Sequence, residues 1–236
     1  MASEQLTARW DGFLNKLKER FNEILGQAEN PMDNIITGLQ YDTVTIHNVL
    51  TGLKNQTVEQ LTQKAQDGWS KMQMELLKSL SVFSQGTEYN KMMALIEWMA
   101  DEFTRFEVRI YAKAARKVLE NVKAHIDEKK MHRCTQCGAE LPIKIFSFVA
   151  VNLKCDSCGS VNTYQPDDRI RAMEYYVINH LAEESALEEK IKGQKDKSAQ
   201  KEYYRKYYGY LMNNVPDKKD FYNRDLEERL NNPFFS

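Results

Sequence analysis

The sequence is poor in the residues that interrupt helices. Only 10 of its 236 residues are glycine and 5 are proline, whereas residues that favour helices, such as Leu, Glu, Lys and Gln, are common. This composition predicts a mainly α-helical chain. Apolar residues make up 42% and charged residues 28%, which is ordinary for a folded domain and argues against a chain that is disordered throughout.

Long apolar runs are also missing. No run reaches the roughly 18 apolar residues that a membrane-spanning helix needs. Residues 1–21 lack the basic start and apolar block of a secretory signal, so we expect a cytoplasmic protein. The formal net charge is only -1, which gives no global attraction to nucleic acid or to acidic membranes.

The sequence motifs of common enzyme classes are absent as well. The sequence contains no glycine pattern that binds phosphate or dinucleotides, no His-Glu-x-x-His and no Gly-x-Ser-x-Gly. None of the four histidines follows a glutamate by three residues, as a di-metal helical bundle would require. We therefore expect a non-enzymatic protein.

Apolar periodicity predicts long amphipathic helices. Residues 3–27 place their apolar side chains on one face, and this helix should end at Asn30 and Pro31. The Thr57-x-x-Gln60 pattern is typical of a capping box and predicts a helix start. No glycine or proline interrupts residues 88–130, which predicts a helix of roughly 60 Å. Part of it should project or pair with another helix, as in a homo-oligomeric coiled coil. Further helices are expected at 167–192, 199–213 and 217–230.

All four cysteines lie in two close pairs, Cys134 with Cys137 and Cys155 with Cys158. Two residues separate the members of each pair and seventeen separate the pairs, a spacing typical of a tetrahedral zinc site. One tight turn can then aim both sulfurs of a pair at a single ion, and the following glycine supplies the positive φ that such a turn needs. We predict one structural Zn²⁺ per chain, held by four thiolates that leave no open position for catalysis.

The two Cys-x-x-Cys-Gly stretches, CTQCG at 134–138 and CDSCG at 155–159, resemble the zinc-ribbon family. The resemblance covers residues 131–165 and implies a small β module around one zinc ion. Zinc ribbons include nucleic-acid binders, subunits of large assemblies and modules that only stabilise a fold, so the resemblance leaves the function open. We recognise no family for the helical remainder.

These observations predict a helical bundle with a long antiparallel helical hairpin that carries a small inserted β zinc ribbon. The helices 88–130 and 167–192 flank the ribbon and form the hairpin. The predicted domains are a helical region at 1–130, the ribbon at 131–165 and the C-terminal helices at 166–236.

Protein binding is the function that we expect, as a scaffold or adaptor within a larger assembly. An accessory protein that binds nucleic acid through the basic rim of the ribbon is one alternative, with Tyr164 among the aromatic residues that could stack on bases. An enzyme or a binder of small ligands or lipids, with a pocket among the Tyr/Met-rich helices, is another. The candidate partner-binding residues are Lys144, Phe146, Phe148 and Lys154 in the ribbon and Phe234 and Phe235 in the tail.

Overall fold

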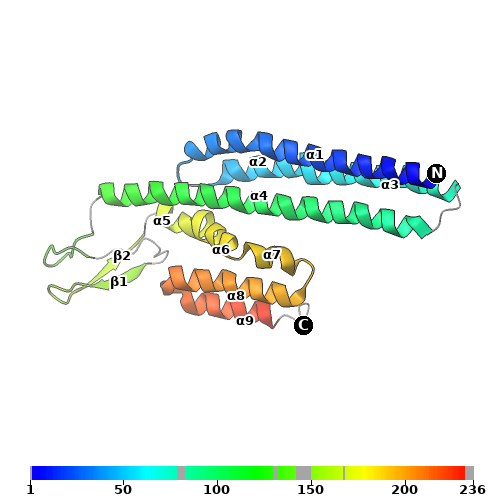
Figure 1. Cartoon of the computed structure of the whole chain (residues 1–236). Coiled ribbons are helices and arrows are strands. Elements are labelled where there is room, and N and C mark those ends of the chain that lie inside the picture. Colours follow the sequence, from blue (N-terminus) through cyan, green and yellow to red (C-terminus); the bar gives the residue numbers. More distant parts are fainter. Residues whose placement is uncertain (1, 79–82, 130–131, 142–149, 167, 232–236) are drawn as a thin grey trace. The chain divides into compact units, whose positions relative to one another are not determined.

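The computed structural model describes residues 2–78, 83–129, 132–141, 150–166 and 168–231 (Figure 1). Helices account for most of these residues, and one antiparallel pair of strands is inserted between two helical segments. The prediction of a mainly α fold with a small inserted β element is therefore confirmed. No helix in the described ranges has the length and apolarity needed to cross a membrane.

The chain divides into two compact units. Unit 1 comprises Met1–Asn34 and His47–Glu107, and unit 2 comprises Ile35–Ile46 and Val108–Ser236. The boundary between them lies within one continuous helix, α4 (Phe83–Lys129), whose 47 residues correspond to about 70 Å. The sequence placed a domain boundary at residue 130 instead, because one uninterrupted helix does not reveal that its two halves enter different cores.

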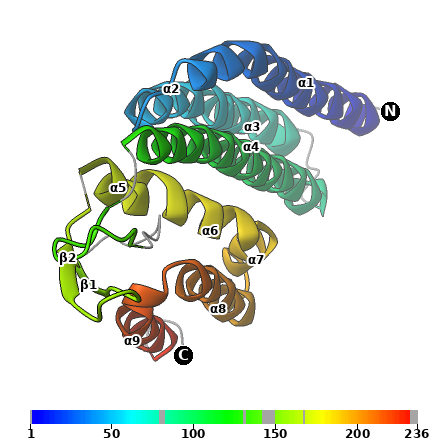
Figure 2. The same cartoon turned by 90° about the vertical axis from the view of Figure 1, so that its left-hand side faces the viewer.

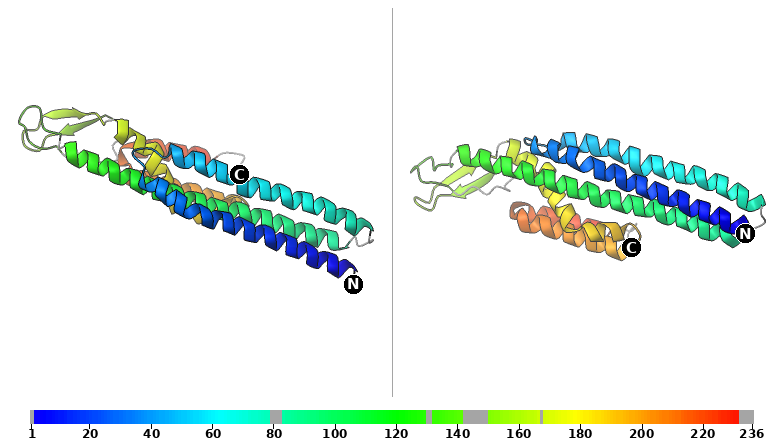
Figure 3. Two further views of the ribbon diagram at one scale, coloured as in Figure 1. Left: turned by 90° about the horizontal axis from the view of Figure 1, so that it is seen from above. Right: turned by 45° about the horizontal axis from the view of Figure 1, so that its top comes forward.

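Unit 1 is built from three long helical segments that lie side by side (Figures 1 and 3). They are α1 (Ala2–Thr37), the segment formed by α2 (Val44–Lys54) and α3 (Gln60–Lys78), and the first half of α4. Arg9 pairs with Glu75, and the Trp10 indole N–H donates to the Glu88 carbonyl. The core contains Trp10, Leu14, Leu17, Phe21, Leu61, Ala65, Met72, Leu76, Met92, Leu95, Met99 and Phe103.

Two predicted helix boundaries in this region are wrong. Pro31 lies inside α1, on its exposed side, and the helix continues because Met32 and Ile36 beyond it are buried. Thr57 does not cap a helix. It lies in a π-helical turn (Asn55–Glu59) that joins α2 to α3, and its hydroxyl donates back to the Leu53 carbonyl at 2.7 Å. Tertiary packing has overridden the local signal at both places, through burial of Met32 and Ile36 after Pro31 and of Thr57 itself.

Unit 2 contains the second half of α4, the β-hairpin and a set of shorter helices. These are α5 (Asp168–Met173), a π-helical turn (Glu174–Ile178), α6 (Asn179–Ser185), α7 (Leu187–Gly193), α8 (Lys197–Asn214) and α9 (Lys219–Leu230). Helix α8 contacts α6, α7 and α9 (Figure 2). The core of unit 2 is made by Ala112, Ala115, Val118, Val122, Tyr164, Ile170, Met173, Val177, Ile178, Leu181, Ala182, Tyr208, Leu211, Val215 and Tyr222.

The predicted antiparallel hairpin is present within unit 2. Arg169 of α5 contacts the ring of His125 near the end of α4. Glu184, further along the chain in α6, pairs with Arg116, which precedes His125 on α4. The two segments therefore run in opposite directions. The predicted helix 167–192 is interrupted at Ala186, whose φ and ψ are -117° and 17°. The Ser185 hydroxyl donates to the Ala182 carbonyl there, which favours a tighter turn over helix continuation.

Candidate metal centre

The two cysteine pairs lie in two hairpin turns that repeat the same geometry 21 positions apart. In the first turn the Gly138 N–H donates to the Cys134 carbonyl at 2.9 Å, and in the second the Gly159 N–H donates to the Cys155 carbonyl at 2.8 Å. The φ angles of Gly138 and Gly159 are 74° and 72°, as the sequence predicted. Side chains strongly disfavour this left-handed region, which explains glycine at both positions.

Short β pairing flanks both turns in the same way. Arg133 pairs with Glu140 in an isolated antiparallel bridge beside the first turn. Lys154 pairs with Val161 beside the second turn, where β1 (Val151–Lys154) and β2 (Val161–Tyr164) form the hairpin. The first cysteine of each pair is buried and the second is exposed. The two turns therefore present their sulfurs with matching backbone support.

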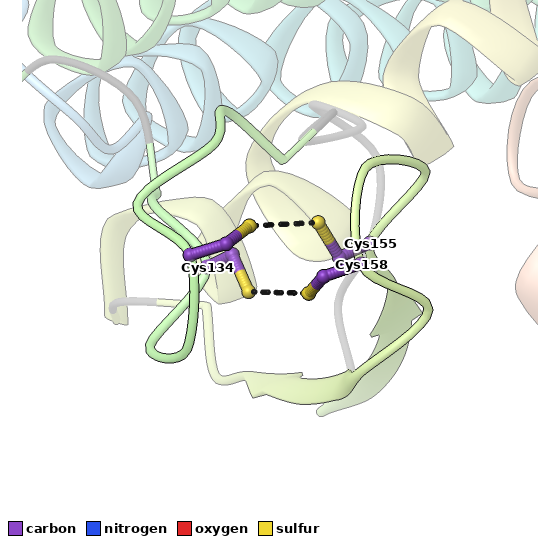
Figure 4. Close-up of side chains that lie close together, drawn as sticks. Cys134, Cys155 and Cys158 are labelled. Atoms are coloured by element: carbon purple, nitrogen blue, oxygen red, sulfur yellow. Dashed lines mark hydrogen bonds between the residues drawn. The ribbon is translucent and has the colours of Figure 1, made fainter.

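All four sulfurs converge on one point. They lie within 4.8 Å of one another. The sulfurs of Cys134 and Cys158 are 3.6 Å apart, as are those of Cys137 and Cys155, and Figure 4 shows the cluster. A tetrahedral zinc ion with bonds of about 2.3 Å spaces its sulfurs about 3.8 Å apart. None of the four forms a disulfide. The donor set and its spacing thus fit a metal ion that prefers four thiolates.

Two side chains that were not predicted from the sequence, those of Ser160 and Asn162, form hydrogen bonds with the sulfurs. The Ser160 hydroxyl lies 3.0 Å from the Cys134 sulfur and 3.1 Å from the Cys158 sulfur. Asn162 is buried, and its amide N–H donates to the Cys134 sulfur at 3.5 Å. The Asn162 carbonyl oxygen accepts from the backbone N–H of Thr135 at 2.9 Å. Asn162 therefore ties strand β2 to the first cysteine turn.

The thiols differ in their acidity. A hydrogen bond with Ser160 and backbone N–H groups lower the pKa of Cys134 to about 5, and Ser160 also lowers the pKa of Cys158. The Ala139 N–H lowers the pKa of Cys137, but the sulfurs of Cys158 and Cys155 outweigh it and raise that pKa to about 12. Metal binding needs all four sulfurs, that of Cys137 included, as thiolates, and a bound divalent cation would supply the compensating positive charge.

We predict that Asn162→Ala weakens metal affinity by about 10- to 100-fold, because residues that orient metal ligands commonly contribute that much. Competition with a chelator of known affinity measures the change. Asn152→Ala is the matched control, since Asn152 is an exposed asparagine on the paired strand β1 and its contact is to the Thr163 hydroxyl. Equal affinities for the two variants would contradict the role assigned to Asn162.

Of the predicted partner-binding residues, Lys154 lies exposed at the end of β1 beside the cysteine cluster. Lys144, Phe146 and Phe148 between the two cysteine pairs, and Phe234 and Phe235 near residue 236, lie outside the described residues. Tyr164, considered as a base-stacking aromatic, is 8% exposed and packs in the core of unit 2. Its ring is therefore not free to stack on a base.

Two tyrosines of α8, Tyr207 and Tyr208, join this helix to its neighbours. The Tyr207 hydroxyl donates to the Asn179 side chain and the Tyr208 hydroxyl donates to Asp225. Burial raises the pKa of Tyr207 above its usual range, and burial together with the bond to Asp225 raises that of Tyr208 to about 12. These phenols stay protonated at neutral pH and act as hydrogen-bond donors between packed helices.

Comparison of the chain with models of protein families, with curated proteins and with solved structures finds no match.

Proposed function

We propose that this chain is a non-enzymatic adaptor of the cytoplasm, in which a structural Zn²⁺ holds a zinc-ribbon module that binds a protein partner. The observation that carries the proposal is the convergence of four sulfurs from two equivalent turns. Four thiolates close a tetrahedral shell, and a closed shell stabilises a fold and performs no catalysis. Reducing conditions keep such cysteines available as ligands.

The outer side of the module supports a binding role. Val161 is 65% exposed, and the exposed Lys154 pairs with it across the hairpin. The Arg133–Glu140 pair occupies the equivalent place beside the other turn. An apolar side chain framed by charged ones is typical of the surface of a transient protein interface. The metal would keep this surface rigid, which lowers the entropic cost of binding.

Capture of partners from native cells tests the adaptor role. We expect the zinc-loaded chain to retain a specific protein partner, and Lys154→Glu to reduce capture at least tenfold without loss of metal. Lys219→Glu is the matched control, because Lys219 is an exposed lysine on α9 with the same charge change. A chain that retains no protein, or retention that Lys154→Glu leaves unchanged, contradicts the proposal.

Nucleic-acid binding is the second candidate, and the exposed cations Arg133 and Lys154 at equivalent positions favour it. The same preparations distinguish the two functions. Tight binding to single- or double-stranded nucleic acid that weakens steeply with salt, and falls further in Lys154→Glu, would replace the adaptor role with this one. The buried Tyr164 and the net charge of -1 favour the adaptor.

A further inference from the structure

Unit 1 carries a groove whose lining residues all come from α1 and α3. Its volume is about 500 Å³, and Trp10, Phe13 and Met72 form its apolar floor. Sites for small molecules in proteins are commonly about 300–1,000 Å³ and combine an apolar lining with a few polar groups. The groove has the size of a ligand site, so its chemistry decides which ligand would fit.

The floor of the groove is fixed before any ligand arrives. The rings of Trp10 and Phe13 stack with their centroids 5.5 Å apart, and the Trp10 indole N–H donates to the Glu88 carbonyl at 3.1 Å. A Cβ on Gly68 would lie 2.6 Å from a ring carbon of Phe13. Glycine at this position therefore lets the Phe13 ring lie against the backbone of α3. A preformed apolar floor lowers the cost of ligand binding.

Some of the charged side chains that line the groove have a partner of opposite charge among the described residues, and others do not. Arg9 and Glu75 form an ion pair at 2.5 Å, and Asp67 accepts a hydrogen bond from the Gln63 amide at 2.9 Å. Lys64 and Lys71 line the same groove and lie exposed two turns apart on α3. Within the described ranges, the structure gives neither lysine an ion-pair partner. Among the residues that line the groove, the cations Arg9, Lys64 and Lys71 outnumber the anions Asp67 and Glu75, so the lining carries a formal charge of +1.

We propose that this groove binds a small anionic amphiphile. Its apolar body would lie on Trp10, Phe13 and Met72, and its carboxylate or phosphate group would meet Lys64 and Lys71. Apolar contact supplies most of the binding free energy, and the two ammonium groups select a negative head group over a neutral one. The proposal is independent of the metal centre and of the partner-binding role.

The test uses the full zinc-loaded chain and three probes with the same alkyl chain: dodecanoate and dodecyl phosphate below their micelle concentrations, and dodecanol below its solubility limit. Trp10 forms part of the groove, so its fluorescence reports occupancy, and calorimetry gives the stoichiometry. We expect one saturable site for both anions and at least tenfold weaker binding of the alcohol. Lys64→Glu/Lys71→Glu should weaken binding of both anions at least tenfold and leave the alcohol unchanged.

Lys16→Glu/Lys54→Glu is the matched control, because it makes the same charge change at two exposed lysines of unit 1 outside the described lining of the groove. It should bind both anions as the unsubstituted chain does. Equal loss in the two double variants would reduce the effect to net charge and overturn the site. Binding that requires anionic vesicles, or no saturable binding of either anion, would overturn it too.

Discussion

Cys155→Ser should abolish stoichiometric metal binding and unfold the β-hairpin. Cys155 is 1% exposed and its sulfur lies 3.6 Å from that of Cys137, so its loss removes one of the four sulfurs that we propose as metal ligands. Structural zinc contributes about 10–16 kcal/mol of apparent binding free energy in small zinc-binding modules. The hydrophobic cluster around the cysteines is small, and besides two cysteines its buried residue is Leu141. Its burial cannot supply a comparable stabilising free energy.

Metal analysis and hydrogen exchange of the amides in β1 and β2 check this prediction. The unsubstituted chain should hold about one Zn²⁺ and protect these amides, whereas Cys155→Ser, or treatment with a strong chelator, should lose both the metal and the protection. Ser157→Ala is the matched control, because Ser157 is an exposed residue of the same turn. Protected hairpin amides in metal-free Cys155→Ser would contradict the prediction and show that the β-hairpin folds without metal.

The cysteine turns could be predicted from the sequence because their geometry is local. Two residues between cysteines, with glycine next, dictate the turn whatever surrounds it, and both Gly138 and Gly159 adopt the expected φ. The supporting residues could not be predicted in this way. Asn162 occupies the position that corresponds to Leu141 in the other turn, so an alignment of the two turns at an offset of 21 residues reveals a polar residue where its counterpart is apolar.

The presence of the long helices could be predicted from the sequence, but the residues at which they begin and end were predicted less well. The apolar stripe of residues 88–130 gave α4 within a few residues of its start and end, since many positions contribute to that signal. The signals at Asn30–Pro31 and at Thr57 with Gln60 rest on two residues each, and burial of Met32 and of Thr57 itself shows that tertiary packing decided both places. The division of α4 between two cores depends on contacts far apart in the sequence, which periodicity does not contain.

Phe21→Ala should destabilise unit 1 by about 3–5 kcal/mol and leave the metal in place. Phe21 is fully buried and packs edge-on against Trp98 with ring centroids 5.3 Å apart. Replacing a buried phenylalanine by alanine costs about this much, because it removes apolar contact and leaves a cavity. That is a large fraction of the about 5–15 kcal/mol by which domains are stable.

The chain offers separate readouts for this prediction. All three tryptophans, Trp10, Trp69 and Trp98, lie in unit 1, so their fluorescence during urea denaturation follows that unit. The cysteines lie in unit 2, so release of zinc to a coloured indicator follows the other. Leu77→Ala is the control, because Leu77 lies in the same unit, is 57% exposed and should cost much less. If Phe21→Ala shifts zinc release together with the fluorescence transition, the two cores unfold as one, and the metal centre depends on the entire helical body.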